Sequence, residues 1–452
     1  MIRYQSQRVA LPYIQLSLLL FILQVVMGLW LAVNYGFTLP QGLVDTFSFA
    51  TSRALHTNLL VAWLLLGFMG GTYFVLPAEC ERELFSAKLA YVQLVIFALA
   101  AVAAVVGFLF GWTQGKPLLE IPVPLDLVIV VAALIFIANV FLTVATAKKR
   151  SVLSWMLVGG VVFLALLYLL GIPFYKDLNA DYYYWWWVIH LWVEGAWELI
   201  TASIMAFVIL EVTGVERHVV ERWLYVETGL FLFTGIVGTG HHYYWIGAPD
   251  YWIWWGGIFS ALEPVPIALM VVDTWLHIKK RQNAIVNHLT WVYIVGMALY
   301  HFLGAGVWGF IHTLPPINYY THGSQITVSH GHMAFFGAYA LLNLTVFYYA
   351  LPQLKGIKKY DDRLGSWGFW TMCVAMFFLS LVFGVAGILQ TYLERFLDIG
   401  YMTAHMSMMF WFKTALAIGV LFLAGVVATV VHLFTLKEAV EQPAAQPVRV
   451  RA

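Results

Sequence analysis

The stretch VSHGHMAFFGAYALL, residues 328–342, places His330 and His332 in an otherwise apolar helical sequence. Successive residues of an α-helix are rotated by about 100°, so residues at i and i+2 point to nearly opposite sides of the helix. An unpaired imidazole in hydrocarbon costs free energy, so each ring needs a partner. The pair therefore predicts a helix that holds a metal cofactor on each flank.

The composition of the whole chain is that of a membrane protein. Of its 452 residues, 62% are hydrophobic and only 10% are charged, which a soluble domain of this length does not show. Runs of about 20 or more apolar residues predict an all-α integral membrane protein with twelve transmembrane helices. We expect these helices at 14–34, 55–77, 88–111, 126–147, 153–173, 185–212, 222–246, 252–278, 285–312, 325–352, 366–390 and 403–436.

The chain is expected to form one catalytic transmembrane domain over residues 1–438, followed by a disordered cytoplasmic tail over residues 439–452. Most of the 24 Lys and Arg residues fall at the chain ends and in the loops that follow even-numbered helices. Basic residues concentrate on the cytoplasmic side, so both termini are predicted to be cytoplasmic. The lipid bilayer is the partner that the apolar composition indicates. The net charge of +1 says nothing about nucleic acid, and no basic stripe suggests nucleic-acid binding.

Six histidines are predicted to share one layer near the outer side of the membrane. His56 begins the second helix and His190 lies near the start of the sixth, and both helices enter from outside. His241 and His242 lie near the outer end of the seventh helix, and the 330/332 pair begins the tenth. Scattered core histidines would not align in this way, so we interpret all six as metal or haem ligands. His301, a lone histidine at intramembrane depth, is interpreted as a hydrogen-bonding core residue.

Carboxylates accompany these histidines. In HLWVEGAWE, residues 190–198, His190, Glu194 and Glu198 are spaced by four residues and fall along one helix face. Glu263 lies within the eighth helix and precedes two prolines, which predict a kink. Charged groups at this depth are usually functional. The alternative, pairing with Lys413, the one cation at similar depth, would account for at most one carboxylate.

The predicted metal site combines three imidazoles with one carboxylate: His190, His241, His242 and Glu194. Imidazole alone suits copper, zinc or iron, whereas a hard oxygen ligand shifts the preference towards iron over Cu(I). His330 would then ligate a haem that faces this metal and keeps an open side for substrate.

His332, on the other flank, would share a second, six-coordinate haem with His56, suited to electron transfer. The chain contains no C-x-x-C-H sequence, so we expect no covalently attached c-type haem.

Together and in this order, these motifs resemble the haem–copper oxidase superfamily, on the branch of the catalytic subunits of cytochrome-c-dependent nitric oxide reductases. The resemblance spans the whole chain. It implies a low-spin haem b on His56 and His332 and a high-spin haem b on His330. It also implies a non-haem iron on His190, His241, His242 and Glu194.

The resemblance implies an oxidoreductase of denitrification and the respiratory chain, which catalyses 2 NO + 2 e⁻ + 2 H⁺ → N₂O + H₂O. Oxidases of the superfamily generally place a tyrosine one turn after the first copper-ligating histidine, and here that position is Glu194. The resemblance associates Glu198 and Glu263 with the iron site and with proton delivery. Glu120, in the loop KPLLEIPVP, resembles a calcium-binding position of the family; the alternative is an exposed, solvated loop residue.

The resemblance implies that the electron donor is a separate, membrane-anchored cytochrome c subunit on the outer side. A quinol-oxidising relative would instead carry a large N-terminal extension. The implied location is the bacterial cytoplasmic (inner) membrane, with the active-site layer nearer the periplasmic side. The aromatic segment DYYYWWW, residues 181–187, is either part of the docking surface or an interfacial aromatic belt.

Two other functions remain as alternatives at this point. An oxygen-reducing terminal oxidase would hold copper in place of the non-haem iron. A twelve-helix secondary transporter would show inverted repeats and helices broken near the midplane. We find no internal repeat, and six histidines in one layer have no role in a transporter.

Overall fold

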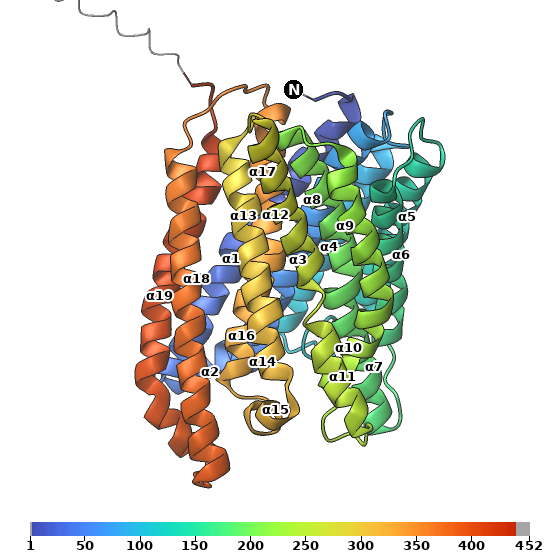
Figure 1. Cartoon of the computed structure of the whole chain (residues 1–452). Helices are drawn as coiled ribbons and strands as arrows, with labels where there is room; N and C mark the ends of the chain where they lie inside the picture. The colour runs from blue at the N-terminus through green and yellow to red at the C-terminus, as the bar shows by residue number, and fades with distance from the viewer. Residues whose placement is uncertain (1, 440–452) are drawn as a thin grey trace, which may run out of the picture.

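The computed structural model describes residues 2–439, and over that range it is helical without any β-strand. Figure 1 shows the helices running along one common direction in a single bundle. Within the described residues, eleven helical segments are long and apolar enough to cross a membrane. Except for Ala439, the tail predicted over residues 439–452 lies outside the described residues.

The first five spans are uninterrupted helices. After the short turn η1 (Gln5–Val9), they are α1 (Ala10–Gly36), α3 (Phe49–Glu79), α4 (Ala87–Leu109), α5 (Val123–Ala145) and α6 (Val152–Gly171), with the short α2 (Gln41–Thr46) between the first two. Ser48, Ser86 and Ser151 each accept a backbone N–H at the start of a helix. These caps satisfy N–H groups that have no partner within the helix, so the polar residues fix where the apolar helices begin.

Several later spans contain wider, π-helical turns. They are α7 (Leu178–Leu191), η2 (Trp192–Ala196) and α8 (Trp197–Thr213); α13 (His288–His301), η5 (Phe302–Trp308) and α14 (Gly309–Thr313); α16 (Gln325–Phe335), η6 (Phe336–Ala340) and α17 (Leu341–Leu354); and α18 (Arg363–Thr391) with η7 (Tyr392–Phe396). A π turn is rare and frequently marks a functional site. The remaining long span is α19 (Tyr401–Thr435), and the short α15 (Pro315–Thr321) connects α14 to α16.

The helix predicted over residues 222–246 is present, but it is not among the eleven apolar spans. It consists of α9 (Arg217–Leu230), η3 (Phe231–Gly235), α10 (Ile236–Gly238) and η4 (Thr239–His242). In Figure 1, α9 and α10 follow one another along the bundle. The charged residues of α9 lower the hydropathy of this segment. Eleven spans of the described residues therefore have the length and composition of a membrane helix, and the total of twelve transmembrane helices stays a prediction.

The kink predicted in the eighth helix is confirmed. α11 (Asp250–Ser260) ends before Glu263, and α12 (Pro264–Arg281) begins directly after it. Proline has no N–H to donate and fits the first helical position, so Pro264 starts a new helix.

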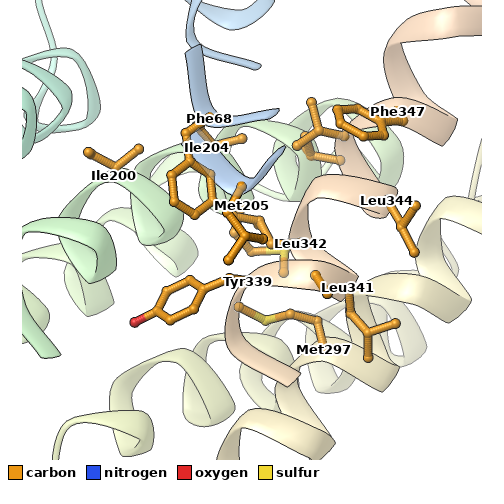
Figure 2. Packing of buried hydrophobic residues seen from close by; sticks show 14 of the residues in the cluster. Phe68, Ile200, Ile204, Met205, Met297, Tyr339, Leu341, Leu342, Leu344 and Phe347 are labelled. Atoms are coloured by element: carbon orange, nitrogen blue, oxygen red, sulfur yellow. The ribbon is translucent and has the colours of Figure 1, made fainter. Parts of the chain in front are cut away.

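Burial separates the central spans from the peripheral ones. The segments α7–α8 and α16–α17 are buried over most of their length, whereas α1, α4 and α5 are mostly exposed on the outside of the bundle. Figure 2 shows the apolar centre, where Phe68 of α3, Met205 of α8 and Leu342 of α17 pack together. The histidines of the 330/332 pair and His190 therefore lie on the most buried spans.

The two ends of the described chain lie at the same end of the bundle, opposite to α15 (Figure 1). This agrees with an even number of passes. The cytoplasmic placement of that end stays a prediction.

We predict that Gly67→Ala destabilises the contact between α3 and α17. A Cβ atom at Gly67 would lie 2.1 Å from Nδ2 of Asn343, which donates a hydrogen bond to the carbonyl of Leu64. Overpacking of this kind costs about 1–3 kcal/mol, so thermal unfolding of the detergent-solubilised protein should occur at a lower temperature. Gly159→Ala is the control, because its Cβ would meet nothing within 4 Å. Equal unfolding temperatures for the two variants would contradict the packing described here.

Candidate metal and haem site

One group of side chains in the described part of the chain is arranged to hold a metal ion. His190, Glu194, His241 and His242 each offer a ligand atom, and these atoms all lie within 4.8 Å of one another. Nδ1 of His190 is 3.6 Å from Oε1 of Glu194, and Nε2 of His241 is 3.9 Å from the same oxygen. The set is the one that the sequence predicts, and it joins the span α7–α8 to the end of the α9–η4 segment.

The orientation of the rings fits a metal. Nε2 of His190 lies 2.8 Å from the carbonyl oxygen of Gly235, while its Nδ1 is buried without any hydrogen-bond partner. Nδ1 of His241 lies 3.4 Å from the carbonyl of Gly256. Histidines that bind metals usually donate their other N–H to a carbonyl or carboxylate, which aims the free nitrogen at the ion. The orphaned Nδ1 of His190 is therefore explained by a bound metal.

The third imidazole is held by stacking. The ring of His242 lies 4.4 Å from that of Trp186 with an angle of 9° between the planes. Trp186 belongs to the aromatic segment at residues 181–187, and Asp181 of that segment forms an ion pair with Lys116, with 2.8 Å between Oδ1 and Nζ. Part of this segment thus positions the metal site. Its predicted role as a docking surface or aromatic belt stays a prediction.

The π turn η2 determines how the carboxylates on this span are used. Glu194 lies within η2 and has non-helical backbone angles, φ −94° and ψ 27°. Its side chain faces His190, whereas Oε1 of Glu198 lies 3.0 Å from Nε2 of His301 on α13. The interpretation of His301 as a hydrogen-bonding core residue is therefore confirmed. With the π turn between them, Glu194 lies at the metal group, and Glu198 bonds to a different span.

A second layer of hydroxyl groups holds the carboxylates. Ser260 at the end of α11 donates a hydrogen bond to Oε2 of Glu194. Thr234 in η3 donates to Oε1 of Glu263 at 3.0 Å, while Oε2 of Glu263 is buried without a hydrogen-bond partner. No sequence pattern indicated Ser260, because a serine in an apolar helix acquires a partner only when the spans pack.

The alternative of pairing with Lys413 is wrong. Nζ of Lys413 lies over the ring of Phe37, 5.0 Å from its centroid. Among the described residues, Glu198 pairs with His301 and Glu263 bonds to Thr234. Lys413 therefore does not neutralise these carboxylates.

The histidines of the 330/332 pair point to opposite sides of α16, as predicted. Nδ1 of His330 lies 3.0 Å from the carbonyl of Gly304 in η5. On the other side, the ring of His332 faces that of His56 on α3, with 6.2 Å between centroids and 24° between planes. Nδ1 of His332 and Nδ1 of His56 both lie against backbone carbonyls, at 2.8 and 2.9 Å.

The spacing of His56 and His332 fits one haem iron held between them. Bonds from a metal to imidazole nitrogen are about 2 Å long, so two rings that share one metal have centroids about 6 Å apart. The observed centroid distance of 6.2 Å agrees with this. Gly28 of α1 permits the arrangement, because a Cβ there would lie 2.7 Å from Cε1 of His56.

Glu120 is buried, with 1% of its surface exposed, so the alternative of a solvated loop residue is wrong. Its Oε2 accepts a hydrogen bond from Nδ2 of Asn58 at 2.8 Å, and its Oε1 has no hydrogen-bond partner, although Nη2 of Arg53 is 3.7 Å away. Burial raises the pKa of the Glu120 carboxyl, and Asn58 and Arg53 oppose that shift. A carboxylate with one unpaired buried oxygen fits a bound cation.

Comparison with known proteins finds a matching family model and several similar proteins. Residues 8–422 match the family model for cytochrome c and quinol oxidase polypeptide I. The chain is 41% identical over 450 residues to a nitric oxide reductase subunit of Stutzerimonas stutzeri, and the alignment covers 94% of each protein. It is also 23% identical over 374 residues to a cytochrome c oxidase subunit 1 homolog of Agrobacterium tumefaciens, with 78% of this chain and 68% of that protein covered. A cbb3-type cytochrome c oxidase subunit of Stutzerimonas stutzeri is 22% identical, with 77% and 76% covered.

We predict that Ser260→Ala weakens metal binding without unfolding the protein. The substitution removes the hydroxyl that fixes Oε2 of Glu194, and the loss of such a supporting group typically costs about 10- to 100-fold in metal affinity. Metal retained during titration with a chelator measures the effect. Ser203→Ala serves as the control, because the hydroxyl of Ser203 bonds only to the backbone of its own helix. Equal retention in both variants would show that Ser260 does not support the site.

Proposed function

Because the chain belongs to the family of cytochrome c and quinol oxidase polypeptide I, the haem–copper oxidases, we propose that it is the catalytic subunit of a nitric oxide reductase. The reaction is 2 NO + 2 e⁻ + 2 H⁺ → N₂O + H₂O. The observation that carries this function is the carboxylate of Glu194 among three imidazoles, since the oxygen ligand favours iron over Cu(I). The similarity to a subunit of nitric oxide reductase over 94% of both chains supports it.

We propose two haems b and one non-haem iron as the cofactors. The low-spin haem would be held by His56 and His332, and the high-spin haem by His330; the iron would be held by His190, His241, His242 and Glu194. When bound, these groups supply electrons, open coordination positions for nitric oxide and Lewis-acid stabilisation of negative charge. The 6.2 Å centroid distance and the orphaned Nδ1 of His190 support the assignment.

The protein itself contributes position and protons. The carbonyls of Gly235 and Gly304 fix the rings of His190 and His330, so the two sides of the site are held in place before substrate arrives. Proton transfer requires groups within hydrogen-bond reach. Glu198, bonded to His301, and Glu263, bonded to Thr234, provide such groups next to the metal site, and Glu194 completes the catalytic carboxylates.

We further propose a membrane-anchored cytochrome c subunit as the electron donor. The 41% identical relative is named as one subunit of a nitric oxide reductase, which indicates an enzyme with more than one subunit. The chain is a multi-pass membrane protein, and we propose the bacterial inner membrane as its location, with the site nearer the periplasmic side. The unpaired oxygen of Glu120 supports a bound calcium ion there.

The proposal is tested by composition and turnover measured together on the purified complex. We expect two haems b and one non-haem iron per chain, calcium removable by a chelator, and nitric oxide turnover with little oxygen consumption. Copper near one atom per chain, with robust oxygen consumption and little nitric oxide turnover, would instead identify an oxygen-reducing oxidase. A colourless, haem-free protein would contradict both functions.

Mutation of one histidine of α16 should affect only the haem on its own side of the helix. We predict that His332→Ala removes the low-spin haem signal and retains the high-spin one, whereas His330→Ala removes the high-spin haem signal and retains the low-spin one. The reason is that the two rings contact different spans, His332 facing His56 and His330 facing Gly304. Optical and electron paramagnetic resonance spectra of each variant check this. Loss of the same haem in both variants would contradict the assignment.

A further inference from the structure

A fourth glutamate, Glu227, lies in the interior of the bundle and has no role so far. Glu198, Glu227 and Glu263 are each only 3% exposed, and they come from three different spans. Within the described residues, none of the three forms an ion pair with lysine or arginine, and His301 pairs with Glu198. Buried charged groups without a partner are costly and usually functional, so Glu227 requires an explanation.

Glu227 lies in the last turn of α9, directly before the π turn η3, and α9 packs against α8. Its carboxyl group contacts that of Glu198. Its Oε2 is buried without a hydrogen-bond partner. An unsatisfied buried polar atom is destabilising, so packing alone gives no reason for a carboxyl at this position. The contact with Glu198 extends the chain of carboxyl groups away from the metal group by one member.

Apolar residues enclose this group of carboxyls on one side. Figure 2 shows the ring of Tyr339 beside Phe68, Met205 and Leu342, with the hydroxyl directed away from them. That hydroxyl donates a hydrogen bond to the carbonyl of Val193, and the phenol lies within electrostatic range of Glu194, Glu198, Glu227 and Glu263. Tyr339 therefore links these carboxyls to the packed apolar centre of the bundle.

Two carboxyl groups in contact cannot both be ionised cheaply where the surroundings are apolar, because like charges repel and neither is solvated. A pair of this kind holds a proton that it can release when one member loses its own. The proposed reaction consumes two protons for each N₂O formed, and Glu198 is the member of the pair that bonds to His301 and lies within electrostatic range of His190.

We propose that Glu227 is a buried proton donor that reprotonates Glu198. After Glu198 has given its proton to the reaction, the O–H bond of the Glu227 carboxyl breaks and a new O–H bond forms on the Glu198 carboxylate. Glu227 then regains a proton from water, and neither residue changes its oxidation state. Glu227 acts through Glu198 and is a positioning and relay residue. The inference rests on the proposed function, because nitric oxide reduction is the step that consumes the protons.

The test compares wild type, Glu227→Gln and Glu227→Asp in the intact, haem-loaded complex. The fully reduced protein is mixed with nitric oxide, and proton uptake is followed with a pH-indicator dye. Infrared difference spectra between the oxidised and reduced protein monitor the carboxylic acid C=O stretch. Asp126→Asn is the control, since Asp126 is another buried carboxyl, bonded to Nε2 of Gln114 at 2.6 Å and distant from the relay in sequence and span.

Glu227→Gln keeps the shape of the side chain but cannot donate the proton. We expect it to slow proton uptake and nitric oxide turnover about 10²- to 10⁴-fold and to lose one C=O band, with haem spectra unchanged. Glu227→Asp should restore most of the rate and show a shifted band, and Asp126→Asn should match wild type. A purely structural role would not remove the band or be rescued by aspartate.

Wild-type proton uptake and a wild-type infrared spectrum in Glu227→Gln would overturn the inference. If Glu227→Gln does not assemble, Glu227→Asp is the deciding variant, because a C=O band that is not shifted there also overturns the inference. A wild-type complex that does not reduce nitric oxide contradicts the proposed function itself, whereas the outcomes above contradict only the role of Glu227.

Discussion

The cost of an unpaired polar group in hydrocarbon is the constraint on which the rest of this structure depends. Of the six candidate ligand histidines, all but His242, which stacks on Trp186, place one ring nitrogen against a backbone carbonyl and leave the other available for a cofactor. Backbone carbonyls supply most of these partners: Gly235 for His190 and Gly304 for His330. Both glycines belong to π turns, η3 and η5, where the regular helical hydrogen-bond pattern is interrupted and carbonyls become accessible. The interruptions of the helices thus position the site.

The same constraint accounts for the way one helix would serve the two proposed haems. His330 and His332 are separated by one glycine and face opposite sides of α16, so neither ring competes for the other's space. Close packing on both sides depends on small residues. A Cβ at Gly309 would lie 2.9 Å from Cε1 of His330, and Gly28 makes equivalent room for His56. Rigid spans bring the two haem sites to fixed positions relative to each other, which suits electron transfer followed by chemistry.

Several buried carboxyl groups have no lysine or arginine partner among the described residues, and these groups can carry protons. Glu198, Glu227 and Glu263 are buried on separate spans, and hydroxyls and one imidazole are their main partners. A bundle selected only for stability would replace them with apolar residues, because buried charge is a poor source of stability. Their retention next to the metal group accords with a reaction that takes up protons as well as electrons. Tyr339 packs against apolar residues and donates its hydroxyl to the carbonyl of Val193, beside these carboxyls.

The amino-acid pattern alone predicted the class of protein, eleven of the apolar spans and the four residues that lie together as a candidate metal site, because a histidine or glutamate in a long apolar run is conspicuous and costly. It also predicted the break before Pro264 and the opposite orientation of His330 and His332, which follow from helix geometry alone. Only the tertiary structure decided the partners. Ser260 and Glu227 acquire their roles through contacts between spans, and Glu120 is buried although it lies in a loop. Such contacts depend on the rotation and register of each helix, and the π turns change both without a clear signal in the sequence.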